Sequence, residues 1–133
     1  MLEAIAAADL ILFAPSNPVV SISPILAIPG MREAIRDAAA PVVGVSPIIN
    51  GAVVRGMADA CLTAIGVETT AAAVALHYGS RASGGILDAW LVDSVDADSL
   101  GEIEAAGIRA AAVPLWMTDP ATTAEIVRAT TTA

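Results

Sequence analysis

Continuous apolar runs alternate along the chain with segments in which apolar residues recur at helical spacing. Four runs, at residues 10–14, 42–45, 86–92 and 108–113, predict strands that are buried on both faces. The segments between them predict helices, so strands and helices alternate through the chain. This order is typical of an α/β domain with a mostly parallel sheet. We therefore expect a single α/β domain over residues 1–133 with a three-layer, Rossmann-like fold and helices on both faces of the sheet.

The first predicted strand, at residues 10–14, is apolar along its whole length. Strands that are apolar along their whole length normally pair on both sides. Here only a short predicted helix precedes the first such strand. The sheet is therefore expected to be the later part of a larger sheet.

Capping residues mark the ends of several predicted helices. Thr70 is a candidate N-cap for a helix over 71–78, and Asp119 is a candidate N-cap for the last helix. Ser99 and Glu102 have the spacing of a capping box at the start of another helix. The last residues of the chain are expected to be frayed.

A hairpin and a further helix are predicted in the middle of the chain. An Asn-Gly pair at 50–51, flanked by apolar residues, predicts a β-hairpin. An apolar stripe that includes Met57, Cys61 and Ile65 follows it. This spacing predicts a helix whose stripe faces the core.

The charges are strongly unbalanced. The chain has 14 acidic residues against six arginines and no lysine, which gives a net charge of −8. Binding to a nucleic acid or to an anionic membrane surface needs a basic patch. We therefore expect neither kind of partner.

Residues 10–31 carry no charge and are long enough to cross a bilayer. Four prolines interrupt this stretch, so a continuous helix is not expected there. The first residues lack the basic and apolar segments of a secretory signal, and a single cysteine excludes an internal disulfide framework. We expect a cytoplasmic protein that does not associate with membranes.

Polar residues follow the first two predicted strands where each strand ends. A proline-braced loop with Ser16 and Asn17 follows the first strand, and Ser46 follows the second. The carboxyl ends of parallel strands meet at one edge of a sheet, where free backbone N–H groups and hydroxyls bind anionic ligands. The alternative is a pair of structural loops whose polar side chains satisfy their own backbone. Arg55 is the only cation near the Asn-Gly pair and can bind a phosphate, or it can be a solvated surface residue.

Other reactive side chains fit structural roles. His77 lies in a predicted helix and is expected to be partly buried, and Cys61 is expected to be a small core residue. Trp90 and Trp116 are expected to pack in the core or at its edge rather than to stack on a base. The acidic residues within 93–98 lack the pattern of a calcium loop and are expected to cap and solubilise the following helix.

Three stretches carry a family resemblance: P-S-N-P-V-V-S-I at 15–22, P-V-V-G-V-S-P-I-I at 41–49 and W-M-T-D-P at 116–120. With the segments between them, they resemble the actinobacterial 2-phospho-lactate and phosphoenolpyruvate transferases of coenzyme F-420 biosynthesis. Members of that family are longer, and nothing in this chain resembles their glycine-rich first half. The chain is therefore expected to be the C-terminal half of such an enzyme.

The resemblance implies a magnesium-dependent transfer reaction. A phospholactyl or phosphoenolpyruvyl group, activated as a guanosine diphospho derivative, passes to the ribityl hydroxyl of the deazaflavin Fo, and GMP is released. The implied cofactor is Mg²⁺, whose ligands are expected in the N-terminal half, so this chain alone is expected to be inactive. The implied partners are the guanosine diphospho donor and Fo. Exposed sheet and high hydropathy also favour association into a homodimer.

The resemblance also assigns binding roles to particular residues. The two loops already described coincide with the family's phosphate and nucleotide loops. With the arginine near the hairpin included, the expected substrate-binding residues are Ser16, Asn17, Pro18, Ser21, Ser46, Pro47 and Arg55. Two other functions remain open: a non-catalytic nucleotide or nucleotide-sugar binding module of the same fold, and an inactive fragment whose apolar surface binds a partner.

Overall fold

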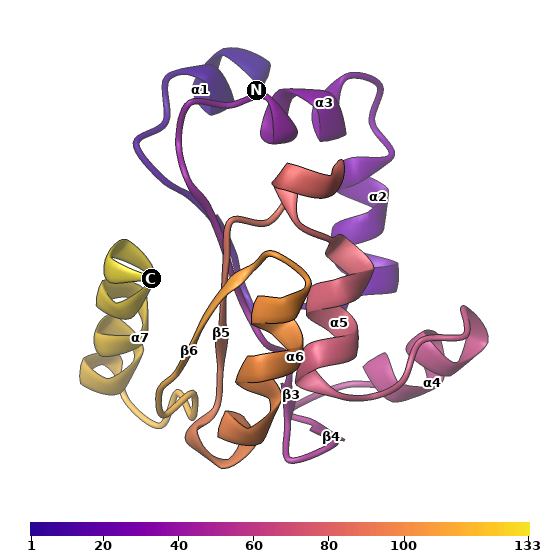
Figure 1. Ribbon diagram of the computed structural model, residues 1–133, viewed down its shortest axis with the longest axis vertical. Coiled ribbons are helices and arrows are strands. Elements are labelled where there is room, and N and C mark those ends of the chain that lie inside the picture. The colour runs from indigo at the N-terminus through magenta and orange to yellow at the C-terminus, as the bar shows by residue number, and fades with distance from the viewer.

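Four parallel strands in the order β1-β2-β5-β6 form the main sheet of the computed structural model, which describes residues 1–133 (Figure 1). Their bounds are Ile11–Phe13 (β1), Val42–Val45 (β2), Ala89–Val92 (β5) and Arg109–Ala112 (β6). All four run toward the lower end of the molecule in Figure 1. The carboxyl ends of β1 and β2 therefore lie at the same edge, which confirms the parallel arrangement predicted from the apolar runs.

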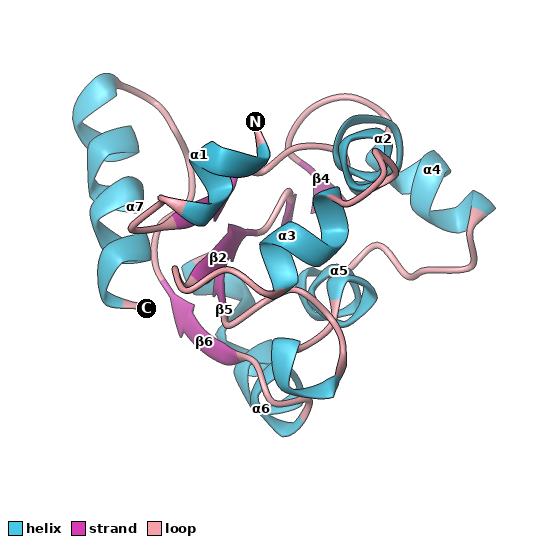
Figure 2. Ribbon diagram, turned by 90° about the horizontal axis from the view of Figure 1, so that it is seen from above, coloured by secondary structure: helices cyan, strands magenta, loops and turns pink.

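Helices cover both faces of this sheet. Figure 2 shows α7 on one face and α5 and α6 on the other, so the expected three-layer α/β architecture is confirmed. The helices are Leu2–Ala6 (α1), Ser23–Leu26 (α2), Met31–Arg36 (α3), Ala58–Ala64 (α4), Ala71–Tyr78 (α5), Leu100–Ala105 (α6) and Pro120–Thr132 (α7), with short helical turns at Pro18–Ile22 (η1), Arg81–Ser83 (η2) and Ser94–Ser99 (η3). None of these helices combines the length and the apolar character that crossing a bilayer requires.

The predicted hairpin forms a small second sheet beside the carboxyl edge. Strands β3 (Ile48–Ile49) and β4 (Ala52–Val53) pair antiparallel. Asn50 and Gly51 connect them with φ angles of 51° and 71°. This left-handed backbone at both central positions explains why an Asn-Gly pair occupies the turn.

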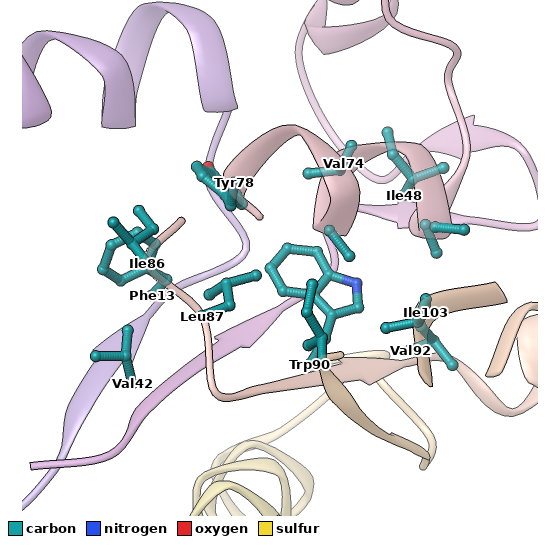
Figure 3. Close-up of a cluster of buried hydrophobic side chains, with 14 of the residues drawn as sticks. Phe13, Val42, Ile48, Val74, Tyr78, Ile86, Leu87, Trp90, Val92 and Ile103 are labelled. Carbon is teal, nitrogen blue, oxygen red and sulfur yellow. The ribbon is translucent and has the colours of Figure 1, made fainter. Parts of the chain in front are cut away.

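The larger core cluster surrounds Trp90, which lies in the middle of Figure 3. Its indole covers Gly44 on the neighbouring strand, where an added methyl group would lie 2.3 Å from Cζ3 of the indole. Phe13 and Tyr78 meet edge to face at 5.5 Å between ring centroids on the same side of the sheet. The absence of a side chain at Gly44 therefore makes room for the largest residue of the core.

An ion pair between Arg81 and Asp88 at the opposite, amino edge of the sheet connects η2, the loop before β2 and the segment before β5. The guanidinium of Arg81 donates hydrogen bonds to the carbonyls of Ala38 and Ala40, and it lies 3.1 Å from the carboxylate of Asp88. That carboxylate accepts a 2.8 Å hydrogen bond from the backbone N–H of Val42 at the start of β2. The sheet is thus anchored at the edge where no ligand is expected.

Strand β1 lies at one end of the sheet. No strand of this chain pairs with its outer side, and the side chain of Leu12 is 38% exposed. The apolar sequence of β1 favours a paired strand on each side, but residues 1–133 supply only one, β2.

Several local predictions are wrong. The stretch after β1 is helical through η1 and α2 rather than an irregular loop. In α4 the residues that face the core are Ala58 and Leu62, whereas Met57 and Ile65 are exposed and Cys61 is half-buried. The predicted stripe lies one position away from the buried face because the hairpin and η1, rather than the main sheet, flank this helix.

Two helix ends also differ from expectation. Ser99 makes no capping hydrogen bond with its side chain, because η3 leads directly into α6. Helix α7 continues to Thr132 instead of fraying. Thr130 is buried and its hydroxyl donates to the carbonyl of Val127, so part of this tail belongs to the packed structure. The N-caps predicted at Thr70 and Asp119 are confirmed.

Candidate functional site

Three loops at the carboxyl edge of the sheet enclose a cavity of about 510 Å³. They follow β1, β2 and β6, and the segment after the hairpin completes the wall. The residues that line this carboxyl-edge cavity are Pro15, Asn17, Pro47, Val54, Arg55, Ala58, Leu115, Trp116, Met117 and Thr118. A volume of this size is typical of sites for small ligands, and the carboxyl edge is where open α/β sheets bind them.

Asn17 caps the helical turn after β1 and also lines the cavity. Its Oδ1 accepts hydrogen bonds from the backbone N–H groups of Val19 (2.9 Å) and Val20 (3.3 Å). Its carbonyl accepts from the N–H groups of Ser21 and Ile22. The expected set of free N–H groups is therefore not present over residues 19–22, because the helical turn uses them. The side-chain Nδ2 is directed to the sulfur of Cys61 at 3.5 Å.

The other predicted residues of this loop lie outside the cavity lining. Ser16 is half-buried, Pro18 is buried at the start of η1, and Ser21 is exposed. The hydroxyl groups of Ser16 and Ser21 make no hydrogen bond within the chain. These two hydroxyls therefore have no partner within the chain, but neither residue lines the cavity.

Ser46 and Pro47 have different roles at the end of β2. Ser46 is 1% exposed. Its hydroxyl donates a 2.8 Å hydrogen bond to the carbonyl of Ile48 and accepts a 3.1 Å hydrogen bond from the N–H of Ile48. It therefore shapes the turn toward β3. Pro47 is buried and lines the cavity.

Arg55 is the one cation that lines the cavity. The residue is exposed, and its guanidinium forms no ion pair or hydrogen bond within the chain. Of the other five arginines, Arg36, Arg81 and Arg128 each have a carboxylate partner, and the unpaired Arg32 and Arg109 lie outside the cavity lining. A free guanidinium beside a cavity is suited to bind a phosphate or carboxylate through paired hydrogen bonds.

Sequence reasoning missed the loop between β6 and α7. Residues 115–118 contribute four of the lining side chains. Trp116 is among them, although the sequence analysis favoured packing over stacking on a base for this residue. A signal was available, because β6 is predicted as a parallel strand and its carboxyl end must lie at the same edge as those of β1 and β2. The same rule that selects the first two loops applies to this one.

A second cavity of similar volume lies between the end of β6 and α7, lined by Val113, Pro114, Thr122, Glu125, Ile126, Arg128, Ala129 and Thr132. Its arginine is already paired with Glu125. Only one strand end contributes to it. The carboxyl-edge cavity, where three strand ends meet beside an unpaired cation, is therefore the better candidate site.

The remaining reactive groups lie outside the carboxyl-edge cavity. His77 is exposed, with its ring 5.7 Å from that of Tyr78. Partial desolvation of the imidazole first, and the positive charge of Arg32 second, lower its pKa. Tyr78 is buried, which raises the pKa of its phenol. The chain contains no cluster of three or more His, Cys, Asp or Glu side chains arranged to hold a metal ion.

Comparison with known proteins agrees with the resemblance seen in the sequence. The family model described as 2-phospho-L-lactate transferase CofD matches residues 1–124. The chain is 64% identical over 128 residues to the phosphoenolpyruvate transferase of Streptomyces griseus subsp. griseus, 63% to that of Streptomyces coelicolor and 61% to that of Mycobacterium avium. These matches cover 96% of this chain but 39%, 39% and 36% of the relatives, in their C-terminal part. The chain therefore belongs to the 2-phospho-L-lactate transferase CofD family.

Proposed function

We propose that this chain forms a nucleotide-binding part of a transferase in coenzyme F-420 biosynthesis. The reaction moves a phospholactyl or phosphoenolpyruvyl group from a guanosine diphospho donor to the deazaflavin Fo and releases GMP. Family membership supports the reaction class, and the names of the relatives favour the phosphoenolpyruvyl donor. The observation that carries the proposal is the unpaired Arg55 in a cavity where three strand ends meet.

The transfer requires that negative charge be neutralised on a diphosphate. The ribityl hydroxyl oxygen of Fo attacks the phosphorus that bears the three-carbon acid, and a new P–O bond forms. The bond from that phosphorus to the bridging oxygen breaks, GMP leaves with the bonding electrons, and the hydroxyl proton passes to solvent water. Charge grows on the leaving phosphate as this happens. The guanidinium of Arg55 is proposed to bind the diphosphate and stabilise that charge.

Neutral donors are proposed to complete the binding of the diphosphate. Nδ2 of Asn17, which lines the cavity, is one candidate. The hydroxyl groups of Ser16 and Ser21, in the same loop but outside the cavity lining, are the other two. Pro47 forms part of the wall. Pro18 and Ser46 are proposed to position these groups, since Pro18 starts η1 and the hydroxyl of Ser46 is used within its own turn.

The lining residues do not fit a magnesium site. Mg²⁺ is normally bound through carboxylates, and none of the ten side chains that line the cavity is an Asp or a Glu. No step of the reaction is therefore assigned to a metal held by this chain. Magnesium dependence remains a prediction for the longer protein, as do the homodimer and the cytoplasmic location.

The lining contains no His, Asp, Glu, Lys, Cys or Tyr side chain, so it offers no general base for the hydroxyl proton. The contribution proposed for this chain is binding and charge stabilisation, and the chain alone is expected to show no turnover. The same observation favours one second candidate, a non-catalytic nucleotide-binding module. Turnover of the activated donor with Fo, after the missing family segment is supplied, distinguishes the transferase from that module.

Calorimetric titration with guanosine diphosphate tests the binding role. Arg55→Gln is expected to weaken binding about 10- to 100-fold, because hydrogen bonds to a charged group are lost. Arg109→Gln is the matched control, since Arg109 is also exposed and unpaired but lies at the amino end of β6. No binding by the unaltered chain, or equal losses in both variants, would refute the proposed site.

A further inference from the structure

Trp116 is the exposed tryptophan of the chain, with 54% of its surface accessible against 1% for Trp90. It belongs to the segment that joins β6 to α7, and this segment lies near the lower end of the molecule in Figure 1. The side chain contributes to two concavities. One is the carboxyl-edge cavity, and the other is an apolar hollow of about 330 Å³ against the β3–β4 hairpin.

The backbone on both sides of Trp116 is held in place. Leu115 is buried, and its N–H donates a 2.8 Å hydrogen bond to the buried carboxylate of Asp93. The N–H of Thr118 donates to the carbonyl of Trp116 at 3.0 Å, and Asp119 caps α7 immediately afterwards. The exposure of the indole is therefore a fixed feature of the fold and does not arise at a frayed end.

The surroundings of the indole combine an apolar wall with a cation. Val54 and Met117 line the same cavity and are themselves 45% and 47% exposed. Arg55 and Asn17 supply the polar part of that wall. A cavity with these two parts matches a ligand in which a flat ring is joined to a negatively charged chain.

We propose that Trp116 stacks on the flat heteroaromatic ring of a ligand that binds in this cavity beside Arg55. This inference rests on the proposed function and names the residue that recognises the ring. Stacking of a base on an aromatic side chain is worth about 5- to 100-fold in affinity. Two rings share this chemistry: the guanine of the donor and the tricyclic deazaflavin of the acceptor.

Two substitutions of Trp116 separate a ring from a merely apolar surface. Trp116→Leu keeps an apolar side chain without a ring, and Trp116→Phe keeps a ring. Each variant is titrated calorimetrically with guanosine diphosphate, with Fo and with inorganic pyrophosphate, after circular dichroism shows an unchanged fold. Trp116→Leu is expected to bind one of the two ring ligands about 5- to 100-fold more weakly, and Trp116→Phe to bind it within about threefold of the unaltered chain. The ligand that loses affinity identifies the ring, and pyrophosphate is expected to bind all three proteins equally.

Tryptophan emission gives an independent readout. Since Trp90 is buried, contact quenching by guanosine diphosphate is expected to come from Trp116 and to disappear in Trp116→Phe. If Trp116→Leu binds both ring ligands as tightly as the unaltered chain, while Arg55→Gln weakens binding of guanosine diphosphate, stacking is overturned and the proposed function stands. If the unaltered chain binds neither ligand, both proposals are overturned.

Discussion

The buried carboxylate of Asp93 accepts a 2.8 Å hydrogen bond from the backbone N–H of Leu115, 22 residues further along the chain. Its other oxygen accepts from the N–H of Val95 at 3.1 Å. One side chain at the end of β5 therefore holds both η3 and the loop after β6. This loop carries Trp116 and Thr118 to the candidate site.

Replacement of Asp93 by alanine is expected to lower the free energy of unfolding by about 1–3 kcal/mol, because two backbone N–H groups lose their acceptor. Binding of guanosine diphosphate is expected to weaken as well, since the loop is no longer held. Urea denaturation and calorimetry measure the two effects. Asp98→Ala is the control, since Asp98 is exposed and makes no hydrogen bond with its side chain. Equal stability of the two variants would contradict this role for Asp93.

Gly44→Ala tests the packing of the central strands. The added methyl group would lie 2.3 Å and 2.5 Å from two ring carbons of Trp90, so we expect a loss of about 1–3 kcal/mol in the free energy of unfolding. Gly101→Ala on α6 meets open space and is expected to stabilise the helix by up to about 1 kcal/mol. Thermal or urea denaturation measures the stability of both variants. A Gly44→Ala chain as stable as the unaltered one would show that the indole of Trp90 does not cover this strand.

Arg81→Met tests the anchor at the amino edge. The substitution keeps an apolar stem but leaves the carbonyls of Ala38 and Ala40 without their donor and Asp88 without its counter-ion. A loss of about 1.5–3 kcal/mol in the free energy of unfolding is expected. Arg36→Met removes an exposed ion pair and is expected to change stability little. The same urea midpoint for both variants would show that the contacts of Arg81 do not stabilise the fold more than an exposed ion pair does.

Asn17 is expected to have two separable roles. Asn17→Ala removes the acceptor for the N–H groups of Val19 and Val20, which should cost about 0.5–2 kcal/mol of stability. Asn17→Asp keeps an acceptor and should retain stability, but its charge should repel a diphosphate and weaken binding of guanosine diphosphate. Denaturation and calorimetry on both variants measure the two roles. Tight binding by Asn17→Asp would place the diphosphate away from this residue.

The pH dependence of stability should carry a contribution from His77. Burial first, and the positive charge of Arg32 second, lower the pKa of the folded imidazole below its ordinary value of 6.5. The unfolded chain then binds the proton more readily than the folded chain, so stability falls as the pH drops through the range just below 6.5. His77→Gln should lose less stability than the unaltered chain between about pH 7 and about pH 5. Parallel denaturation series at both pH values provide the measurement, and identical slopes would argue against the shift.

The sequence was sufficient for the main architecture but not for all details of the site. Apolar runs predict the strands because burial on both faces leaves no polar positions, and parallel order then predicts that the strands end at one edge. The helical turn after β1 is not predicted, since prolines and serines are typical of loops, and the cap by Asn17 becomes visible only in three dimensions. Ser46 likewise has the expected position, but its hydroxyl bonds within its own turn.

Burial of single helix faces was harder to predict than the helices themselves. Met57 and Ile65 are exposed because α4 lies beside η1 and the hairpin rather than flat on the sheet. In α7, Val127 is 46% exposed, whereas its apolar neighbour Ile126 is buried. Periodicity gives the spacing of a buried face, and the tertiary contacts decide which rotation of the helix is used.

The outer side of β1 has a practical consequence for handling the chain. An edge strand presents backbone groups that can pair with any other extended segment, and Leu12 adds exposed apolar surface beside them. With only three residues in β1, each such pairing is weak. Concentrated samples are therefore expected to associate reversibly through this strand before they precipitate, and a lysine in place of Leu12 is a rational first change for improving solubility.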